Sequence, residues 1–390
     1  MRNFTFGDVK LLPAFSKPYP DELLSSWIAR LSFDHGLGFT SFLKIVGGII
    51  NCRNFNADFC DHDILRILSL YTNCSFEEVK SASLHCYENA FFENVSQPQQ
   101  VLAAWTFLRF SRENSQNKLG LMFCPKCLSK PGKPVYFRKQ WRLGISFVCL
   151  DCKCYLMDGC PHCENVVSFS KPFDPKVNIS EYLKTCKYCK KDISNCQMFS
   201  APEELVNLQK ELYKVLHHGY EGKGIYPVSY FKVLRRVAAL FSQVKYDHVV
   251  MTPQEQELYP FIQDVIDDHQ HSFPFLHKYL NERTVQRSSA FRRAYKIMLG
   301  HWLLEEWPTR FFYYFRRSNL NRTNILLRCD RNATPFWFWE TVYSNLLPPI
   351  PSIGKIPFGL RKIFRKEPFK RKQYKPKKKY KRREPSHQSI

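Results

Sequence analysis

The chain has 390 residues, of which 44% are hydrophobic and 15% aromatic, enough apolar material for two or three folded domains. Its formal net charge of +23 excludes an acidic protein and favours a polyanionic partner, most simply nucleic acid. The N-terminal twenty residues lack an apolar h-region and the longest apolar runs are too short to span a bilayer, so we expect a cytoplasmic protein without membrane contact. In that compartment the 15 cysteines are reduced, and clustered cysteines are metal ligands rather than disulfides.

Residues 1–115 are predicted to form a helical N-terminal domain. Apolar residues at helical spacing, with start and stop residues at the ends, predict helices over 21–34, 40–46, 63–71 and 75–84. Asp21 is expected to cap the first helix and Gly36 to end it, and Ser75 and Glu78 have capping-box spacing. Such a run of short helices is compatible with a helix-turn-helix, although no base-contacting residue can be named.

Residues 116–199 contain four Cys-x2-Cys pairs. Two residues between ligands let a tight knuckle place both sulfurs on one ion, and two knuckles about 20 residues apart form a zinc ribbon. The segments 133–148 and 165–170 are β-prone and are expected to supply ribbon strands. The predicted ligands of two structural Zn²⁺ ions are Cys124, Cys127, Cys149, Cys152, Cys160, Cys163, Cys186 and Cys189.

The spacing leaves three questions open. The pairs join either in chain order or in a cross-braced arrangement, and iron suits a four-thiolate tetrahedron as well as zinc does. Cys154 lies two residues beyond Cys152 and is an alternative fourth ligand. Either way, four thiolates leave no open position for water activation, so we expect a structural metal.

The other cysteines lack this spacing. Cys196 is expected to be a bystander, and the core is the expected place for Cys52, Cys60, Cys74, Cys86 and Cys329. Cys60-x-His62 suggests a third site only weakly, because Asp61–Asp63 are better explained as the start of a helix. His162 is expected to point outward from its knuckle.

Residues 200–348 are predicted to form a helical C-terminal domain. Helices are expected over 200–219, 229–242, 253–269, 288–306 and 309–318. Ser200 and Glu203 have capping-box spacing, Gly219 is expected to end the first helix, and Pro308 to separate the last two.

Residues 349–390 form a basic tail that is expected to be disordered. From Lys355 onward it holds 15 Lys/Arg against two Glu, which is +13 of the total charge. Its cations would release phosphate counterions without reading sequence, and its tyrosines would stack on exposed bases. The predicted nucleic-acid-binding residues are Lys370, Arg371, Lys372, Lys375, Lys377, Lys378, Lys379, Lys381, Arg382 and Arg383. The segment Tyr136–Arg142 also mixes cations with aromatics, and it forms either a partner surface or a strand with buried aromatics.

Familiar catalytic motifs are missing from the sequence. It contains no P-loop GxxxxGK[ST], no GxSxG and no HExxH, and its acidic residues suggest no two-metal nuclease centre. We therefore predict no catalytic residues and no enzyme.

Four stretches together resemble the TniQ/TnsD family of transposition target-selection proteins. They are KPYPDELLSSWIARLS at 17–32, FCPKCL at 123–128, QWRLGISFVCLDCKCYLMDGCPHC at 140–163 and LLEEWPTRFFYYF at 303–315. The resemblance covers about residues 10–345 and implies a helix-turn-helix region, a zinc-binding centre and a helical C-terminal part. The family's zinc ligands fall on the cysteines named above, except that the family commonly has histidine at the position of Cys152.

The resemblance also implies a function and partners. Members are non-catalytic and prokaryotic, and they recruit an AAA+ regulator ATPase that in turn brings in the transposase. Some bind attachment DNA directly, and others dock as homodimers on a guide-RNA CRISPR effector complex. The single helical region after the cysteines favours the shorter, adaptor type. From the residues alone, two kinds of protein remain as alternatives to a targeting adaptor: a zinc-ribbon DNA-binding regulator, and a nuclease with an unfamiliar site.

Overall fold

The computed structural model describes residues 11–49, 55–91, 121–220, 223–241, 253–269, 289–317 and 334–346. These residues are mainly helical, with one two-stranded antiparallel sheet in which β1 (Val148–Cys149) pairs with β2 (Cys154–Tyr155). The expected fold class, mainly α with a small β-containing cysteine-rich region, is confirmed. Among the described helices, none is long and apolar enough to cross a membrane.

The N-terminal helices lie where the apolar periodicity predicts them. They are α1 (Leu24–Asp34), α2 (Phe39–Gly47), α3 (His62–Thr72) and α4 (Phe76–Ala82), with the 3-10 turns η1 (Ala57–Phe59) and η2 (Leu84–Tyr87). The capping box of Ser75 and Glu78 is confirmed, and Gly36 follows α1 in the left-handed region at φ 66°. Asp21 does not cap α1: the N-cap residue is Leu23, and the Asp21 carboxylate accepts a hydrogen bond from Tyr136 instead.

The cysteine-rich region contains little regular structure. It has α6 (Pro125–Leu128), η3 (Lys139–Arg142) and α7 (Ile179–Lys184) around the two short strands. The expected strands over 133–148 and 165–170 are wrong apart from Val148. The backbone groups of this segment have scattered partners in place of a ladder: the Phe137 carbonyl accepts from the Leu23 amide, and the Phe147 and Val148 amides donate to the Gln209 side chain.

The C-terminal helices also follow the predicted pattern. They are α8 (Glu203–His218), α9 (Pro227–Leu240), α10 (Pro253–His269), α11 (Ala290–Glu305), α12 (Thr309–Arg317) and α14 (Phe336–Asn345). Gly219 ends α8, and Pro308 separates α11 from α12. The capping box proposed for Ser200 and Glu203 is wrong, because α8 starts after Pro202 without a side-chain cap. The sequence analysis did not predict α14.

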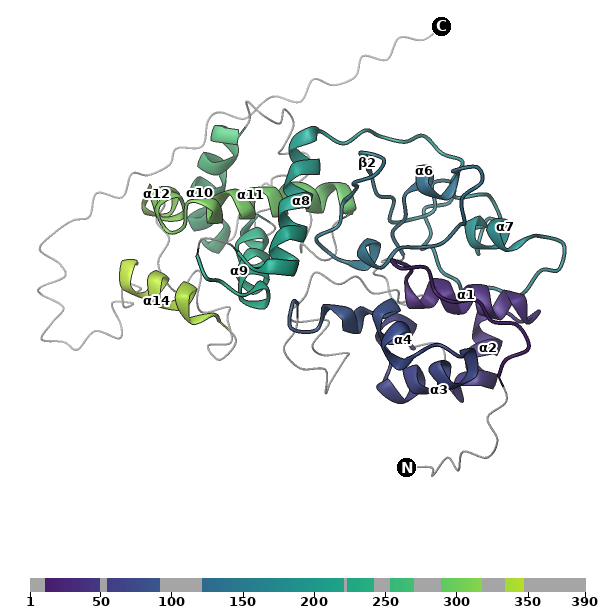
Figure 1. The fold of residues 1–390 in the computed structure, drawn as a ribbon. Coiled ribbons are helices and arrows are strands. Elements are labelled where there is room, and N and C mark those ends of the chain that lie inside the picture. The colour runs from purple at the N-terminus through teal and green to yellow at the C-terminus, as the bar shows by residue number, and fades with distance from the viewer. Residues whose placement is uncertain are drawn as a thin grey trace, which may run out of the picture.

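Two buried clusters organise the molecule. Trp27, Leu31, Phe42 and Leu65 belong to the smaller cluster, inside the N-terminal helices. The larger cluster runs without interruption from the cysteine-rich region into the C-terminal helices. Figure 1 shows α1 between the other N-terminal helices and the loops around α6 and α7.

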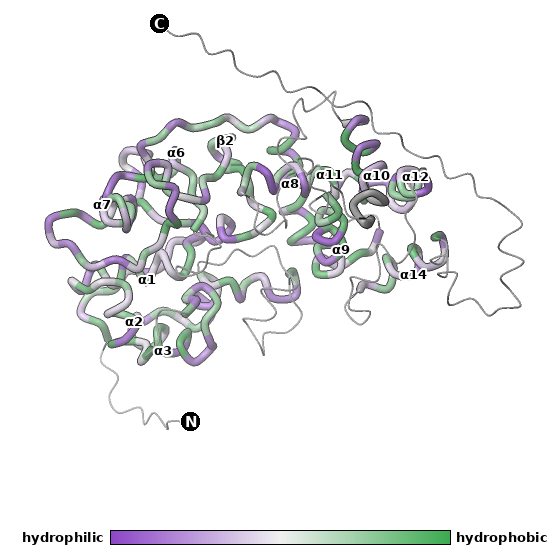
Figure 2. The backbone as a smooth tube through the Cα atoms, turned by 180° about the vertical axis from the view of Figure 1, so that it is seen from behind, coloured by the Kyte–Doolittle hydropathy of each residue, from purple (hydrophilic) through white to green (hydrophobic). Residues whose placement is uncertain are grey.

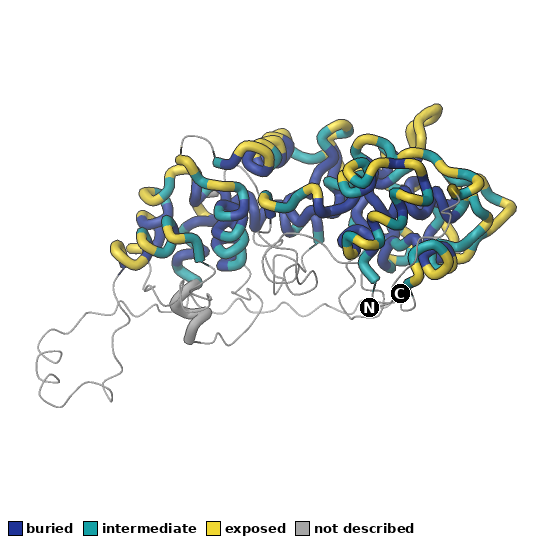
Figure 3. Tube along the Cα trace, turned by 60° about the horizontal axis from the view of Figure 1, so that its bottom comes forward, coloured by how far each residue is buried: buried dark blue, intermediate teal, exposed yellow. Residues whose placement is uncertain are grey.

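Hydropathy and burial along the backbone show how the helices pack around the core. The helices alternate between hydrophobic and hydrophilic residues along the chain, as amphipathic helices do (Figure 2). Buried stretches run through the middle of the body, and exposed stretches lie at its rim (Figure 3). One continuous core therefore fixes the cysteine-rich region against the C-terminal helices.

Candidate metal centres and the joint beside them

Three of the four cysteine pairs share one backbone geometry. The amide after the second cysteine donates to the carbonyl of the first, from Lys153 to Cys149 at 2.8 Å, Glu164 to Cys160 at 2.8 Å and Lys190 to Cys186 at 3.1 Å. Lys153, Glu164 and Lys190 all lie in the left-handed region, at φ 53°, 58° and 62°. This turn reverses the chain tightly enough to aim both thiols of a pair at one point.

The pair Cys124 and Cys127 makes the same backbone hydrogen bond at the start of a short helix, without a residue in the left-handed region. Pro125 begins α6, Cys124 is its N-cap residue, and the Leu128 amide donates to the Cys124 carbonyl at 3.1 Å. The Cys127 amide also points at the Cys124 sulfur, at 3.4 Å. A proline at the first helical position suits this turn because its missing N–H would have no partner there.

The thiols gather in two groups of four, in chain order. Each group has its sulfurs within 4.8 Å of one another, and the groups are Cys124, Cys127, Cys149, Cys152 and Cys160, Cys163, Cys186, Cys189. These are the eight cysteines that the sequence singles out. The cross-braced alternative is not the arrangement of this structure.

Sulfur–sulfur distances show that each group is already near metal-binding geometry. The Cys127 sulfur lies 3.6 Å from that of Cys149 and 3.5 Å from that of Cys152. In the second group the distances are 3.6 Å from Cys160 to Cys189 and 3.7 Å from Cys163 to Cys186. A tetrahedron with Zn–S bonds of about 2.3 Å has edges of about 3.8 Å, so an ion fits each group after small shifts.

Hydrogen bonds among the thiols make the members of the first group unequal. Hydrogen bonds from the thiols of Cys124 and Cys127 hold the pKa of Cys149 well below its usual range. Hydrogen bonds with Cys127, Cys149 and Cys154, together with burial, raise the pKa of Cys124. A divalent cation would remove this inequality by deprotonating all four thiols.

Cys154 is a fifth thiol beside the first group. Its sulfur lies 3.6 Å from that of Cys124, and it is buried on β2, opposite Cys149. The group of four contains Cys152 rather than Cys154. The alternative ligand suggested by the spacing is thus adjacent to the site but outside the set.

Most remaining predictions about cysteine and histidine hold. Cys60 and Cys74 are core residues, whereas Cys86 is exposed and the expectation for it is wrong. Asp61 is the N-cap residue of α3, as expected. His162 is exposed, and its Nε2 lies 2.9 Å from the Asp192 carbonyl oxygen. Cys52 and Cys329 lie outside the described residues.

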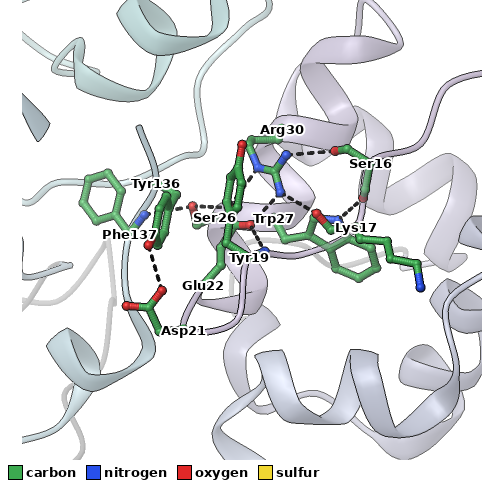
Figure 4. A network of polar contacts seen from close by, with 10 residues as sticks. All are labelled: Ser16, Lys17, Tyr19, Asp21, Glu22, Ser26, Trp27, Arg30, Tyr136 and Phe137. Atoms are coloured by element: carbon green, nitrogen blue, oxygen red, sulfur yellow. Dashed lines mark hydrogen bonds and ion pairs between the residues drawn. The ribbon is translucent and has the colours of Figure 1, made fainter. Parts of the chain in front are cut away.

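The segment Tyr136–Arg142 is a joint between α1 and the cysteine-rich region rather than a free surface. Backbone bonds link the Leu23 amide to the Phe137 carbonyl at 2.8 Å and the Lys139 amide to the Asp21 carbonyl at 2.9 Å. The Phe137 amide donates to the Ser26 hydroxyl at 3.0 Å (Figure 4). Of the two interpretations, the burial of the aromatic rings is right for Phe137 and Trp141, but the strand is wrong, because Lys139–Arg142 forms the 3-10 turn η3.

A buried ion pair holds the α1 side of this joint. The Arg30 guanidinium donates to both oxygens of Glu22, at 3.0 and 2.6 Å, and the Ser26 hydroxyl donates to the same carboxylate at 2.9 Å (Figure 4). The Arg30 guanidinium also donates to the Lys17 carbonyl at 3.0 Å, and the Trp27 indole N–H donates to the Ser16 carbonyl at 2.6 Å. The stretch at 17–32 that carries the resemblance is therefore one hydrogen-bonded unit.

A second buried ion pair crosses the joint, and no local sequence pattern indicates it. The Asp58 carboxylate in η1 lies 3.0 Å from the Arg142 Nε as an ion pair and accepts a hydrogen bond from the Ser25 amide at 2.8 Å, and both charged side chains are almost fully buried. The two residues are 84 positions apart, so nothing in the local pattern pairs them. The predicted nucleic-acid-binding residues of the tail, from Lys370 to Arg383, lie outside the described residues.

Comparison with known proteins agrees with this geometry. Residues 13–156 match the TniQ family model. This stretch includes the N-terminal helices, the joint at Tyr136–Arg142 and the first four-cysteine group. A search of curated proteins found no match. The TniQ family is one of transposition-associated target-selection adaptors. Residues 13–156 of the chain are therefore similar to the TniQ family.

Proposed function

We propose that this protein is a non-catalytic adaptor that selects the target site of a multi-component transposon. It binds target DNA or a guide-RNA CRISPR effector complex, and it recruits an AAA+ transposition regulator that brings in the transposase. The match of residues 13–156 to the TniQ family carries this proposal. The fold supports it, because the two four-cysteine groups lie in one core with the C-terminal helices and suit a rigid scaffold.

We also assign two structural Zn²⁺ ions to the two groups. Four thiolates close each coordination sphere, so neither ion would activate water or substrate. The ions stabilise the region between α6 and α8, which contains little regular structure of its own. Elemental analysis should find about two zinc ions per chain, and two iron ions instead would replace zinc in this assignment.

Affinity purification from the native host tests the adaptor role. A tagged chain should retain an AAA+ ATPase, together with either CRISPR effector subunits or a discrete attachment sequence in the bound DNA. The control is an unrelated tagged zinc protein of similar charge. Specific DNA without an ATPase would favour a zinc-ribbon regulator, and cleavage of DNA by the purified chain with magnesium would overturn the non-catalytic assignment.

A further inference from the structure

The Cys186–Cys189 knuckle, at the end of the second four-cysteine group, has an exposed aromatic tip. Tyr188 lies between the two cysteines, and 44% of its surface is exposed. The Tyr188 ring lies outside both buried clusters, so the fold does not require an aromatic side chain at this position.

The backbone holds this tip rigidly. The Cys186 amide donates to the Lys191 carbonyl at 2.9 Å, and the Lys190 amide returns to the Cys186 carbonyl at 3.1 Å. The Tyr188 amide points at the Cys186 sulfur at 3.4 Å. Because both cysteines are committed to the metal group, the ring is presented at low entropic cost to a partner.

Three lysines flank the ring in the sequence, and one of them lies close to it. Lys187, Lys190 and Lys191 lie within three residues of Tyr188, and the Lys187 ammonium lies 5.7 Å from the centre of the ring. Lys190 and Lys191 are exposed. Of the nearby carboxylates, Asp192 is already engaged by Lys184 at 3.3 Å and by Ser194 at 2.7 Å.

The first four-cysteine group provides a comparison within the same chain. Its knuckle and the following turn carry the exposed cations Lys126, Lys130 and Lys133. The nearest tyrosine there, Tyr136, is not available, since it stacks on Tyr19 with ring centres 4.8 Å apart and donates to Asp21. Of the two groups, the second thus combines cations with an accessible ring.

Charge and ring together select the partner. A Zn²⁺ ion with four thiolates carries a formal charge of −2, which some of the lysines offset, so charge alone would make a poor polyanion site. A flat exposed ring adds what charge lacks, because it stacks on a base that is not already stacked in a duplex. We infer that the Cys186–Cys189 knuckle binds an unpaired nucleic-acid strand, with Tyr188 stacking on a base and Lys187, Lys190 and Lys191 contacting phosphates. This inference rests on the proposed role at a nucleic-acid target.

Photocrosslinking tests the stacking contact directly on the full chain. An oligothymidylate carrying 5-iodouracil should crosslink to Tyr188, as mapped by mass spectrometry of the digested adduct. Tyr188→Ala should weaken binding of the same oligonucleotide by about 5-fold or more, the effect expected for loss of one stacked base. The basic tail adds binding that falls steeply with salt, so the measurement is made at low and high salt, where the stacking loss should persist.

Matched variants separate the alternatives. Tyr226→Ala removes the most exposed of the large hydrophobic side chains, away from the knuckle, and should leave affinity unchanged. Lys190→Ala with Lys191→Ala should weaken binding more than Lys126→Ala with Lys130→Ala, with two metal ions retained in both. Unchanged affinity in Tyr188→Ala, or crosslinks only to the tail, would overturn the inference and leave the adaptor proposal intact. Tyr188-dependent binding without ATPase recruitment would instead sink the adaptor proposal alone.

Discussion

Cys154 shows how close two chemically equivalent residues come at the first metal centre. It is buried 3.6 Å from the Cys124 sulfur, yet the four mutually close thiols include Cys152. The pairing of β1 with β2 fixes Cys154 opposite Cys149, whereas Cys152 lies in the turn between these strands. The turn, rather than the strand, supplies the fourth thiol of the group.

Substitution of each cysteine checks this assignment. Cys154→Ser should keep two metal ions per chain, because the four ligands remain. Cys152→Ser should lower the metal content, and any ion it retains should be lost when Cys154→Ser is added, since Cys154 is the nearest replacement. Elemental analysis of the purified variants measures the result, and loss of an ion from Cys154→Ser alone would assign the site to Cys154.

His301 predicts a pH dependence of stability. Burial lowers its pKa to about 4, against the opposing charge of Glu211. The Tyr230 hydroxyl lies 2.5 Å from Nδ1, and the Glu305 carboxylate 3.6 Å from Nε2. The folded chain thus binds a proton less readily than the unfolded chain, whose His pKa is about 6.5. The free energy of unfolding therefore has its full value with respect to His301 above pH 6.5. It decreases as the pH falls toward 4, by at most about 3 kcal/mol.

Urea unfolding at pH 7 and pH 5 measures this effect. The wild-type chain should lose more stability between these values than His301→Gln, which cannot titrate. Equal losses in both proteins would show that His301 does not respond in this range.

At the level of elements, α9 and α11 pack closely because Gly300 leaves room for the backbone. A Cβ at Gly300 would lie 3.1 Å from the Ala238 nitrogen and 3.2 Å from its Cα. Ala238 itself is fully buried. A small residue on each helix therefore sets the distance between the two central helices of the C-terminal part.

Gly300→Val should destabilise the chain by about 1–3 kcal/mol, because its methyl groups must push the two helices apart. Gly47→Val in α2 is the control, as its Cβ would meet the flexible side chain of Ile49 alone. Thermal or chemical unfolding measures both variants. A similar loss in the two would indicate that the β-branched side chain, and not the helix contact, is responsible.

For the whole molecule, the joint between the two buried clusters is the feature that local patterns could not predict. Asp58 belongs to the N-terminal helices and Arg142 to the cysteine-rich region, and their ion pair is buried between them. Burial of such a pair is stable only while both charges are present. This ion pair thus acts together with the backbone bonds of Phe137 and Lys139 to hold the N-terminal helices on the rest of the chain.

Asp58→Ala should lower the free energy of unfolding by about 3–5 kcal/mol, since it leaves the buried Arg142 charge without its carboxylate partner. Asp63→Ala is the matched control, because Asp63 forms an exposed pair with Arg66 and should change stability little. Chemical unfolding gives the free energies. A double variant, Asp58→Ala with Arg142→Met, should recover part of the loss, and no recovery would show that Asp58 acts through the Ser25 amide instead.

The sequence by itself determined most of the helices and the eight clustered cysteines. Both are local signals, since apolar spacing, capping residues and Cys-x2-Cys turns act over a few residues. The same locality explains the errors: the β-prone run at 133–148 predicts a strand that forms only at Val148, and no local pattern predicts α14. Only the tertiary structure decided that the thiols join in chain order, that Cys154 stays outside, and that Tyr136–Arg142 is a joint while Tyr188 is exposed. Those outcomes depend on contacts between residues far apart in the chain, whose geometry comes from packing the whole core.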